Sequence, residues 1–246
     1  MTSLARPLET HRIGRIEAPA LAAGEYERFV DLLRSLNPDD WTRPTDCTRW
    51  DVRAIAAHVL GWAETVTMRQ FMRLSRLGKR VARELGSPPI DGMNEVLVRQ
   101  RAGVPPAELV ARLEAAAPRS VAARFSVPAP LRLMPISTPE GRINLGYLND
   151  HIFTRDLFIH RVDISRATGR QMVLRAEHDS RIVGDVVVDW ADRHRRPFRL
   201  LLHGPAGGVY ERGFDGEEHR LDAVDFCRIV SGRAQGAGLL ATRALF

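Results

Sequence analysis

Apolar side chains recur every three or four residues along the first part of the chain, which is the pattern of helices that bury one face. Residues 18–36 carry this pattern up to Asn37 and Pro38, so a first helix is predicted there. After a loop rich in turn residues, Asp51 is suited to cap a long second helix. That helix is predicted to run to about Leu77 and to be ended by Gly78.

Two further helical regions follow. One begins near Asp91, is interrupted by the prolines of residues 104–106 and resumes over residues 107–125. Proline and turn residues dominate residues 126–143, and the helical pattern returns over residues 144–169. Four helical regions of this length predict a bundle.

The pattern of apolar residues and glycines along the chain changes near residue 170. Residues 176–196 predict one more helix, but residues 198–204, 207–214 and 217–222 are short runs separated by glycines, as in strands joined by turns. Residues 223–233 predict a closing helix. The sequence therefore predicts an α domain followed by an α+β domain: a four-helix bundle over residues 1–170 and a smaller α+β domain over residues 171–246.

The net charge raises the question of a nucleic-acid partner, because the 246 residues carry a formal charge of +6. Arginine accounts for all but one of the 36 basic residues, and the densest groups, at residues 73–84 and 192–199, lie where helices should end. We interpret this charge as solvated helix faces and expect no nucleic-acid partner. An arginine-driven nucleic-acid binder would instead need its basic residues on one face.

Other features of the composition limit the location of the protein. The chain has no run of about 18 apolar residues and no signal-peptide pattern at its N-terminus, so we expect no membrane span and no secretion. Cys47 and Cys227 lie far apart and lack the spacing of a zinc module or a disulfide framework. A cytoplasmic protein is therefore predicted.

One stripe of the helix predicted over residues 144–169 carries polar residues that an apolar face does not explain. Its positions, spaced by three and four residues, are Asn149, Phe153, Asp156, His160, Asp163 and Ala167. Asp156 and His160 lie one turn apart, which lets both side chains converge on one point. His58 stands in a similar way among apolar residues of the helix that follows Asp51.

Each of these residues alone has an ordinary structural explanation. Asp156 and His160 resemble a pair on a helix surface, and a single histidine such as His58 is commonly a hydrogen-bonded core or surface residue. Together they favour another interpretation, because a carboxylate buried without a cation destabilises the fold. A divalent metal held by His58, Asp156 and His160, with an open fourth position, would satisfy all three side chains.

The remaining candidate groups receive structural interpretations. Cys47 is interpreted as structural, because no histidine is near it in the sequence. The sequence signatures of serine hydrolases, nucleotide-binding loops, kinases and HExxH metalloproteases do not occur in the chain. The other histidines are expected on the surface: His11, His151, His178, His194, His203 and His219.

Two segments carry motifs that are specific when taken together. Residues 33–62, LRSLNPDDWTRPTDCTRWDVRAIAAHVLGW, join a Pro-Asp-Asp-Trp loop, a Pro-Thr-x-Cys-x-x-Trp segment and a Val-Arg-x-x-x-x-His helix. Residues 154–170, TRDLFIHRVDISRATGR, place an acid four residues before a histidine and end in Ala-Thr-Gly-Arg. Both segments closely resemble motifs of the mycothiol-dependent maleylpyruvate isomerase family, and residues 225–246 are similar to its C-terminal domain.

This resemblance implies a fold and a site. The fold is a DinB-like four-helix bundle that holds a divalent metal, usually zinc, followed by a sterol-carrier-like α+β domain. The implied metal ligands are His58, Asp156 and His160, and the arginine that the C-terminal domain contributes to the cleft is placed at Arg233. In the family, mycothiol occupies the open metal position. The chain departs from the pattern at Asp156, where glutamate is commoner, and at Arg49, which replaces a glycine.

The resemblance also implies thiol chemistry on a small electrophilic substrate. A free thiol has a pKa of about 8.5, and coordination to zinc would deprotonate it at neutral pH. The thiolate would serve cis–trans isomerisation or thiol transfer, while Arg233 would bind a substrate carboxylate. The alternative is a non-catalytic metal-binding or regulatory protein on the same fold. An open coordination position that faces a pocket distinguishes the enzyme from this alternative; the oligomeric state is left open.

Overall fold

The computed structural model of the protein describes residues 11–246. Two compact units make up the chain. The first comprises Ala18–Gln171, and the second comprises the described residues up to Glu17 together with Met172–Phe246. The first unit is mainly helical and the second combines helices with a sheet, so the predicted fold class, a helical bundle followed by a smaller α+β part, is confirmed.

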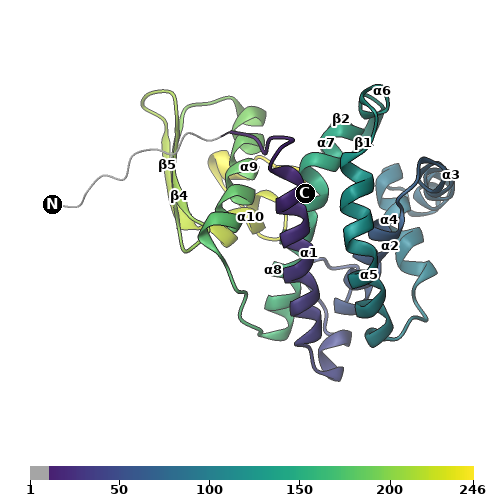
Figure 1. The fold of residues 1–246 in the computed structure, drawn as a ribbon. Coiled ribbons are helices and arrows are strands. Elements are labelled where there is room, and N and C mark those ends of the chain that lie inside the picture. Colours follow the sequence, from purple (N-terminus) through teal and green to yellow (C-terminus); the bar gives the residue numbers. More distant parts are fainter. Residues whose placement is uncertain (1–10) are drawn as a thin grey trace. The chain divides into compact units, whose positions relative to one another are not determined.

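Four helices form the bundle of the first unit: α1 (Ala18–Arg34), α2 (Val52–Glu64), α5 (Pro106–Phe125) and α8 (Phe153–Thr168) (Figure 1). Helix α1 packs against α5 and α8, and α2 closes the ring by packing against the same two helices. Their inner faces share one apolar core. Each large apolar side chain buried there stabilises the bundle by about 1.5–3 kcal/mol.

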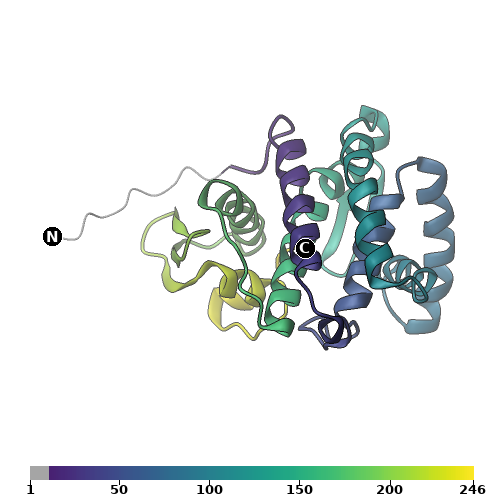
Figure 2. The same ribbon diagram turned by 60° about the horizontal axis from the view of Figure 1, so that its bottom comes forward.

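A helical hairpin made of α3 (Met68–Leu85) and α4 (Pro89–Gln100) lies outside this ring, next to α2 (Figures 1 and 2). Asp51 caps α2 as predicted, because its side chain accepts a hydrogen bond from the Ala54 amide at 2.7 Å. The predicted single helix to Leu77 was wrong, since α2 ends at Glu64 and α3 begins after Thr67.

The prediction that Gly78 ends a helix was also wrong, because this residue lies inside α3. A Cβ atom on Gly78 would lie 2.4 Å from Cγ of Met93, and one on Gly92 would lie 2.1 Å from the carbonyl oxygen of Gly78. Glycine therefore serves a close approach of α3 and α4 at this point. Helix α3 ends instead at Gly86, which adopts a left-handed conformation with φ of 62°.

The segment between α5 and α8 contains secondary structure that its proline and turn residues did not predict. Helix α6 (Ala129–Arg132) is followed by strands β1 (Pro135–Thr138) and β2 (Gly141–Asn144), which form an antiparallel hairpin. A 3₁₀ helix, η1 (Pro38–Thr42), lies earlier in the chain, between α1 and α2. The chain continues through α7 (Leu145–Tyr147) and a π-helical turn, η2 (Leu148–Ile152), into α8. The helical prediction over residues 144–169 is thus confirmed, with a π turn that was not foreseen.

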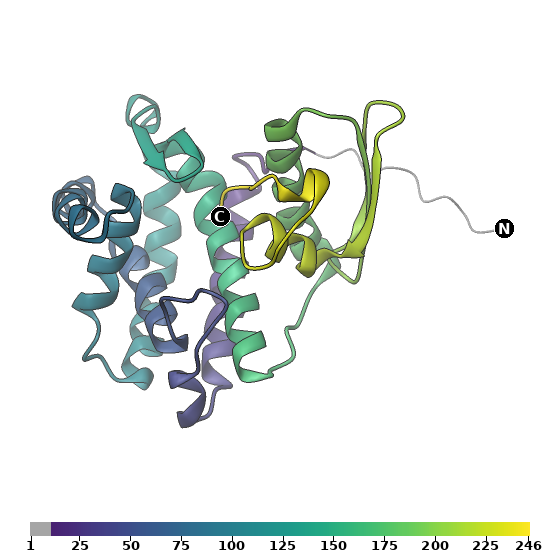
Figure 3. The ribbon, with the colours of Figure 1, turned by 180° about the vertical axis from the view of Figure 1, so that it is seen from behind.

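The second unit is built on a three-stranded sheet with the order β4-β3-β5. Its elements are α9 (Ala176–His194), β3 (Phe198–His203), β4 (Gly208–Arg212), β5 (Glu217–Asp222), α10 (Ala223–Val230) and η3 (Gly238–Ala241). Strand β3 pairs antiparallel with β4 and parallel with β5. Figures 1 and 3 show α9 and α10 on the same face of the sheet, where every second residue of β3 is buried. All three predicted strands are confirmed.

The described residues before α1 pack against α9 of the same unit. The backbone amide of Ile13 donates to Oδ1 of Asp185 at 2.8 Å, and Nε of Arg181 donates to Oε2 of Glu17 at 3.0 Å. The second unit is therefore assembled from two segments far apart in the sequence. Within residues 11–246, no helix combines the length and the apolar character needed to cross a membrane.

Candidate metal centre

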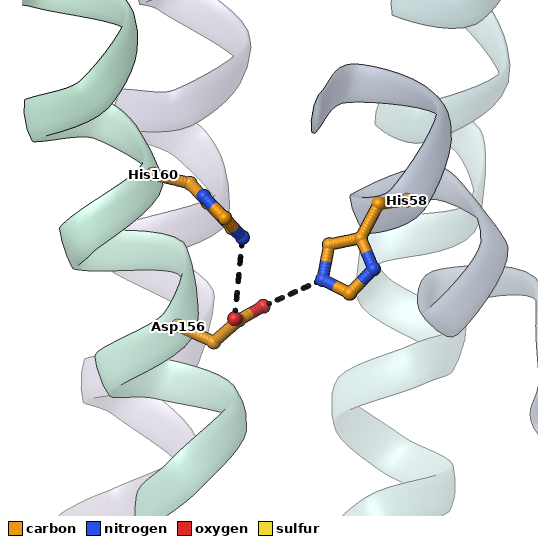
Figure 4. A group of neighbouring side chains, drawn as sticks. All are labelled: His58, Asp156 and His160. Atoms are coloured by element: carbon orange, nitrogen blue, oxygen red, sulfur yellow. Dashed lines mark hydrogen bonds and ion pairs between the residues drawn. The ribbon is translucent and has the colours of Figure 1, made fainter. Parts of the chain in front are cut away.

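His58, Asp156 and His160 lie together between two neighbouring helices of the bundle (Figure 4). His58 projects from α2, whereas Asp156 and His160 project from successive turns of α8. Nε2 of His58 lies 3.1 Å from Oδ2 of Asp156, and Nε2 of His160 lies 3.3 Å from Oδ1 of the same carboxylate. One ligand atom from each residue lies within 4.8 Å of the others.

The surroundings of α2 explain why His58 is buried. This helix packs against α5 and α8 in the ring and against α4 outside it, so its apolar residues are covered on several sides. His58 is only 2% exposed. An imidazole in such a place needs a polar partner, because burying it without a hydrogen bond is unfavourable. Asp156 on α8 is that partner.

The charges of the three residues are strongly coupled. Burial alone would raise the pKa of Asp156, but the neighbouring His160 and His58 hold it well below its usual range. Burial would lower the pKa of His160, but the charge of Asp156 and hydrogen bonds to Asp156 and Asp163 outweigh this effect and raise it to about 9. A metal ion that binds at neutral pH would therefore displace a proton.

The cluster has one side that solvent reaches. The Asp156 side chain is 23% exposed, compared with 2% for the His58 side chain and 3% for that of His160. The imidazoles are held by the core, and the carboxylate lies at the more open edge. A small ligand would therefore reach the cluster past Asp156.

Two residues around the cluster had received no role from the sequence. Oδ2 of Asp163, which is fully buried, lies 2.9 Å from Nδ1 of His160. A carboxylate in this position keeps a proton on Nδ1, so that Nε2 is available to a metal. The ring centroid of Trp50 lies 4.7 Å from that of His58. Asp163 could have been identified as part of the site from its place three residues after His160 on the same stripe. The spacing of residues in the sequence does not point to Trp50.

The other predicted residues have different outcomes. Surface placement of His151 was wrong, because it is 8% exposed and stacks on Tyr147 with 4.5 Å between ring centroids. The cause is the π turn, which buries all five of its residues. Arg233 follows α10 in the second unit, half-buried, and its role at the metal centre stays a prediction. Cys47 and Cys227 are free thiols, so no disulfide joins them.

The donor set fits a divalent metal such as zinc. Two imidazole nitrogens and one carboxylate oxygen are typical ligands of a catalytic zinc site, where a fourth position stays open to water or substrate. Both Nε2 atoms already face the Asp156 carboxylate, and Asp163 orients one imidazole from behind. In the part of the chain that the structure describes, the ligand group at this place has three members, His58, Asp156 and His160.

Comparisons with known proteins connect this fold to one family. A search among curated proteins found no match. The crystal structure of the mycothiol-dependent maleylpyruvate isomerase matches with a TM-score of 0.56 at 15% sequence identity and covers 91% of each chain. The crystal structure of a histidine-to-alanine mutant of that isomerase matches with a TM-score of 0.54 at 14% identity and covers 90% of each chain. These likenesses show a shared fold.

A family model provides the evidence of relationship at the level of sequence. It is described as the mycothiol maleylpyruvate isomerase N-terminal domain, and it matches residues 22–165. This range runs from Ala22, one turn into α1, to Ser165, near the end of α8, and it contains all three residues of the cluster. The match extends over more than half of the chain, which therefore belongs to the mycothiol maleylpyruvate isomerase family.

Proposed function

We propose that this protein is a metal-dependent and mycothiol-dependent enzyme of the maleylpyruvate isomerase type. The observation that carries the proposal is the cluster of His58, Asp156 and His160, whose ligand atoms lie within 4.8 Å of one another. A metal held by three side chains keeps a position for a further ligand, as in catalytic zinc sites. A thiol and a small electrophilic substrate are the partners proposed for that position, by analogy with the related isomerase.

Each residue has a separate task in this proposal. His58 and His160 would hold the metal through Nε2, and Asp156 would complete the set with one carboxylate oxygen. Asp163 would keep His160 in the tautomer that a metal requires, because it accepts from Nδ1. Arg233 is proposed to bind a substrate carboxylate, since a guanidinium donates two parallel hydrogen bonds to such a group.

Zinc bound here would lower the pKa of a coordinated thiol and so supply a nucleophile for addition to a conjugated double bond at neutral pH. The chain itself contributes orientation and a protected environment. The buried imidazoles are held by packing of α2 and α8, and Trp50 covers His58 from one side. Cis–trans isomerisation and thiol transfer both need these elements, and isomerisation is the reaction named for the related structures.

A structural metal site in a non-catalytic or regulatory protein would have a different arrangement. Structural zinc sites are closed by four protein ligands. Among residues 11–246, the ligand group at the cluster consists of three residues, and its Asp156 side chain is 23% exposed. Both observations favour a site that exchanges ligands over one that only holds the fold together.

Metal content and thiol binding together test this proposal. Elemental analysis of the purified protein should find about one zinc per chain, and His58→Ala and His160→Ala variants should lose it. His203→Ala, which changes an exposed histidine at the end of β3, is the matched control and should keep the metal. Mycothiol should bind only to the metallated protein, which should isomerise maleylpyruvate. A protein that takes up no metal after reconstitution would refute the proposal.

A further inference from the structure

A small pocket lies inside the first unit, near the metal cluster but with other residues in its wall. Its volume is about 70 Å³, which is space for roughly five water molecules. The wall is largely apolar and aromatic, with Trp62 from α2, Phe71 from α3 and Phe153 from α8. Its one charged lining residue among those described is Arg124 from α5.

Arg124 is buried and only partly satisfied. It is 8% exposed, and its Nη2 donates to the carbonyl oxygen of Asn149 at 2.6 Å and to Oγ1 of Thr154 at 3.3 Å. Its Nε and Nη1 atoms are buried and have no hydrogen-bond partner in the described chain. Burial lowers the pKa of Arg124, although the Tyr26 hydroxyl and the charges of Asp150 and Asp156 act against this effect. A guanidinium left in this condition favours an anion beside it.

A purely structural role does not account for the whole guanidinium. The bonds from Nη2 tie α5 to the π turn and to the first turn of α8, and Asn149 returns a bond from Nδ2 to the Arg124 carbonyl oxygen at 3.2 Å. The ring of Phe153 lies 4.9 Å from Cζ of Arg124 and stabilises the charge from one side. These contacts satisfy Nη2 and one face of the guanidinium, and the Tyr26 hydroxyl lies close to the group. Nε and Nη1 keep three N–H donors for another partner.

The pocket lies about one helical turn away from the metal cluster. On α2, Trp62 comes four residues after His58, and on α8, Phe153 comes three residues before Asp156. Because a helix rises 1.5 Å per residue, both offsets correspond to roughly 5 Å along the bundle. Asp156 is also close enough for its charge to act on Arg124. A molecule of a few carbon atoms would span the two places.

We infer that Arg124 binds the carboxylate of a small organic acid, whose carbon chain lies against Trp62 and Phe153 and whose other end reaches the metal cluster. Nε and Nη1 are covered by neighbouring side chains, so the carboxylate would accept charge-assisted hydrogen bonds from them once the guanidinium turns toward the pocket that it lines. The size of the pocket limits the acid to a short chain. The inference rests on the proposed function only in treating the cluster as the reaction centre; the anion site itself rests on Arg124.

Calorimetric titration with maleate tests the anion site directly, with its neutral diamide as the uncharged counterpart. Wild-type protein, in both zinc-loaded and metal-free form, should bind maleate more tightly than the diamide. Arg124→Gln should weaken maleate binding about 10- to 100-fold, because hydrogen bonds to a charged group are lost, and should leave diamide binding unchanged. Arg124→Lys keeps the charge and should be intermediate. Arg119→Gln, on the exposed face of the same helix, should behave as wild type.

A second variant keeps the test valid if Arg124 is needed for folding. Val127 is half-buried in the loop after α5 and lines the pocket, so Val127→Phe should fill it and weaken maleate binding while leaving Arg124 in place. Unchanged maleate affinity in the folded variants, or no maleate binding by the wild type, would overturn the inference. Arg124-dependent maleate binding without zinc or mycothiol binding would uphold it and refute the proposed function instead.

Discussion

Replacing Asp163 with asparagine separates the orientation of His160 from the folding of the bundle. Oδ2 of Asp163 lies 2.9 Å from Nδ1 of His160, and the carboxylate is fully buried. An amide oxygen in the same place would accept the same hydrogen bond without the negative charge. The change therefore keeps the shape of the site and removes the charge behind the imidazole.

The expected loss follows from two effects with opposite signs. A metal-bound histidine that loses its carboxylate partner binds metal roughly 10- to 100-fold more weakly, or by about 1.4–2.8 kcal/mol. Asp163 also helps to raise the pKa of His160 to about 9, so without it a proton competes less with zinc at neutral pH. The loss of zinc affinity in Asp163→Asn should therefore be smaller at pH 7 than above pH 9.

Competition with a chromophoric zinc chelator measures this affinity at both pH values. Asp185→Asn is the matched control, because Asp185 is equally buried but accepts its hydrogen bond from Ile13 in the second unit. That variant should lose stability and keep the zinc affinity of the wild type. Wild-type zinc affinity in Asp163→Asn above pH 9 would refute the argument that Asp163 supports the metal through His160.

Three further predictions concern packing, protons and metal. Gly78→Ala should lower the free energy of unfolding by about 1–3 kcal/mol in a denaturant titration, because the added Cβ meets Met93. The pKa of His160 is raised from 6.5 to about 9, so its proton stabilises the metal-free fold below pH 6.5, and this contribution is lost as the pH rises through 9. Zinc binding at pH 7 should release that proton. Calorimetry in buffers of different ionisation enthalpy would measure the number of protons released. Removing zinc that is present at 100 times its Kd should cost about 2.7 kcal/mol of stability and lower Tm, and the Tm of His58→Ala should not respond.

Specific results would contradict each of these three. Gly103→Ala is the packing control, because a Cβ there meets no atom within 4 Å; equal stability losses in the two variants would remove the role of the close approach. Zinc binding without proton release at pH 7 would mean that His160 is neutral in the metal-free protein. A chelator effect on His58→Ala would place the stabilising metal at another site.

The helices and strands were predictable wherever one face of an element is buried. Helix α1 has its apolar residues at the expected spacing, and Asp51 caps α2 as its side chain suggested. The break between α2 and α3 was not predictable from spacing, because Thr67 starts a new helix within a stretch that also suits a continuous one. Gly78 shows the same limit: a glycine that ends a helix and one that admits a neighbouring helix look alike in the sequence.

The candidate site was predictable in part for a similar reason. Asp156 and His160 are neighbours on any regular helix, so their spacing alone placed them together. His58 comes from another helix, and its place beside them depended on the bundle arrangement and on the family resemblance. Arg124 could not be predicted as a site residue, because nothing in the sequence distinguishes a buried arginine from the many exposed ones. Its burial results from the packing of α5 against the π turn.

The two-segment construction of the second unit has a consequence for synthesis of the chain. Glu17 is separated from its partner Arg181 by 164 residues, so at 5–20 residues per second the ribosome adds Arg181 about 8 to 33 s after Glu17. All of Ala18–Gln171 is synthesised within that interval. The apolar side chain of Ile13 is buried in the folded protein. In the nascent chain it stays unpacked during this interval, which gives a chaperone time to bind it.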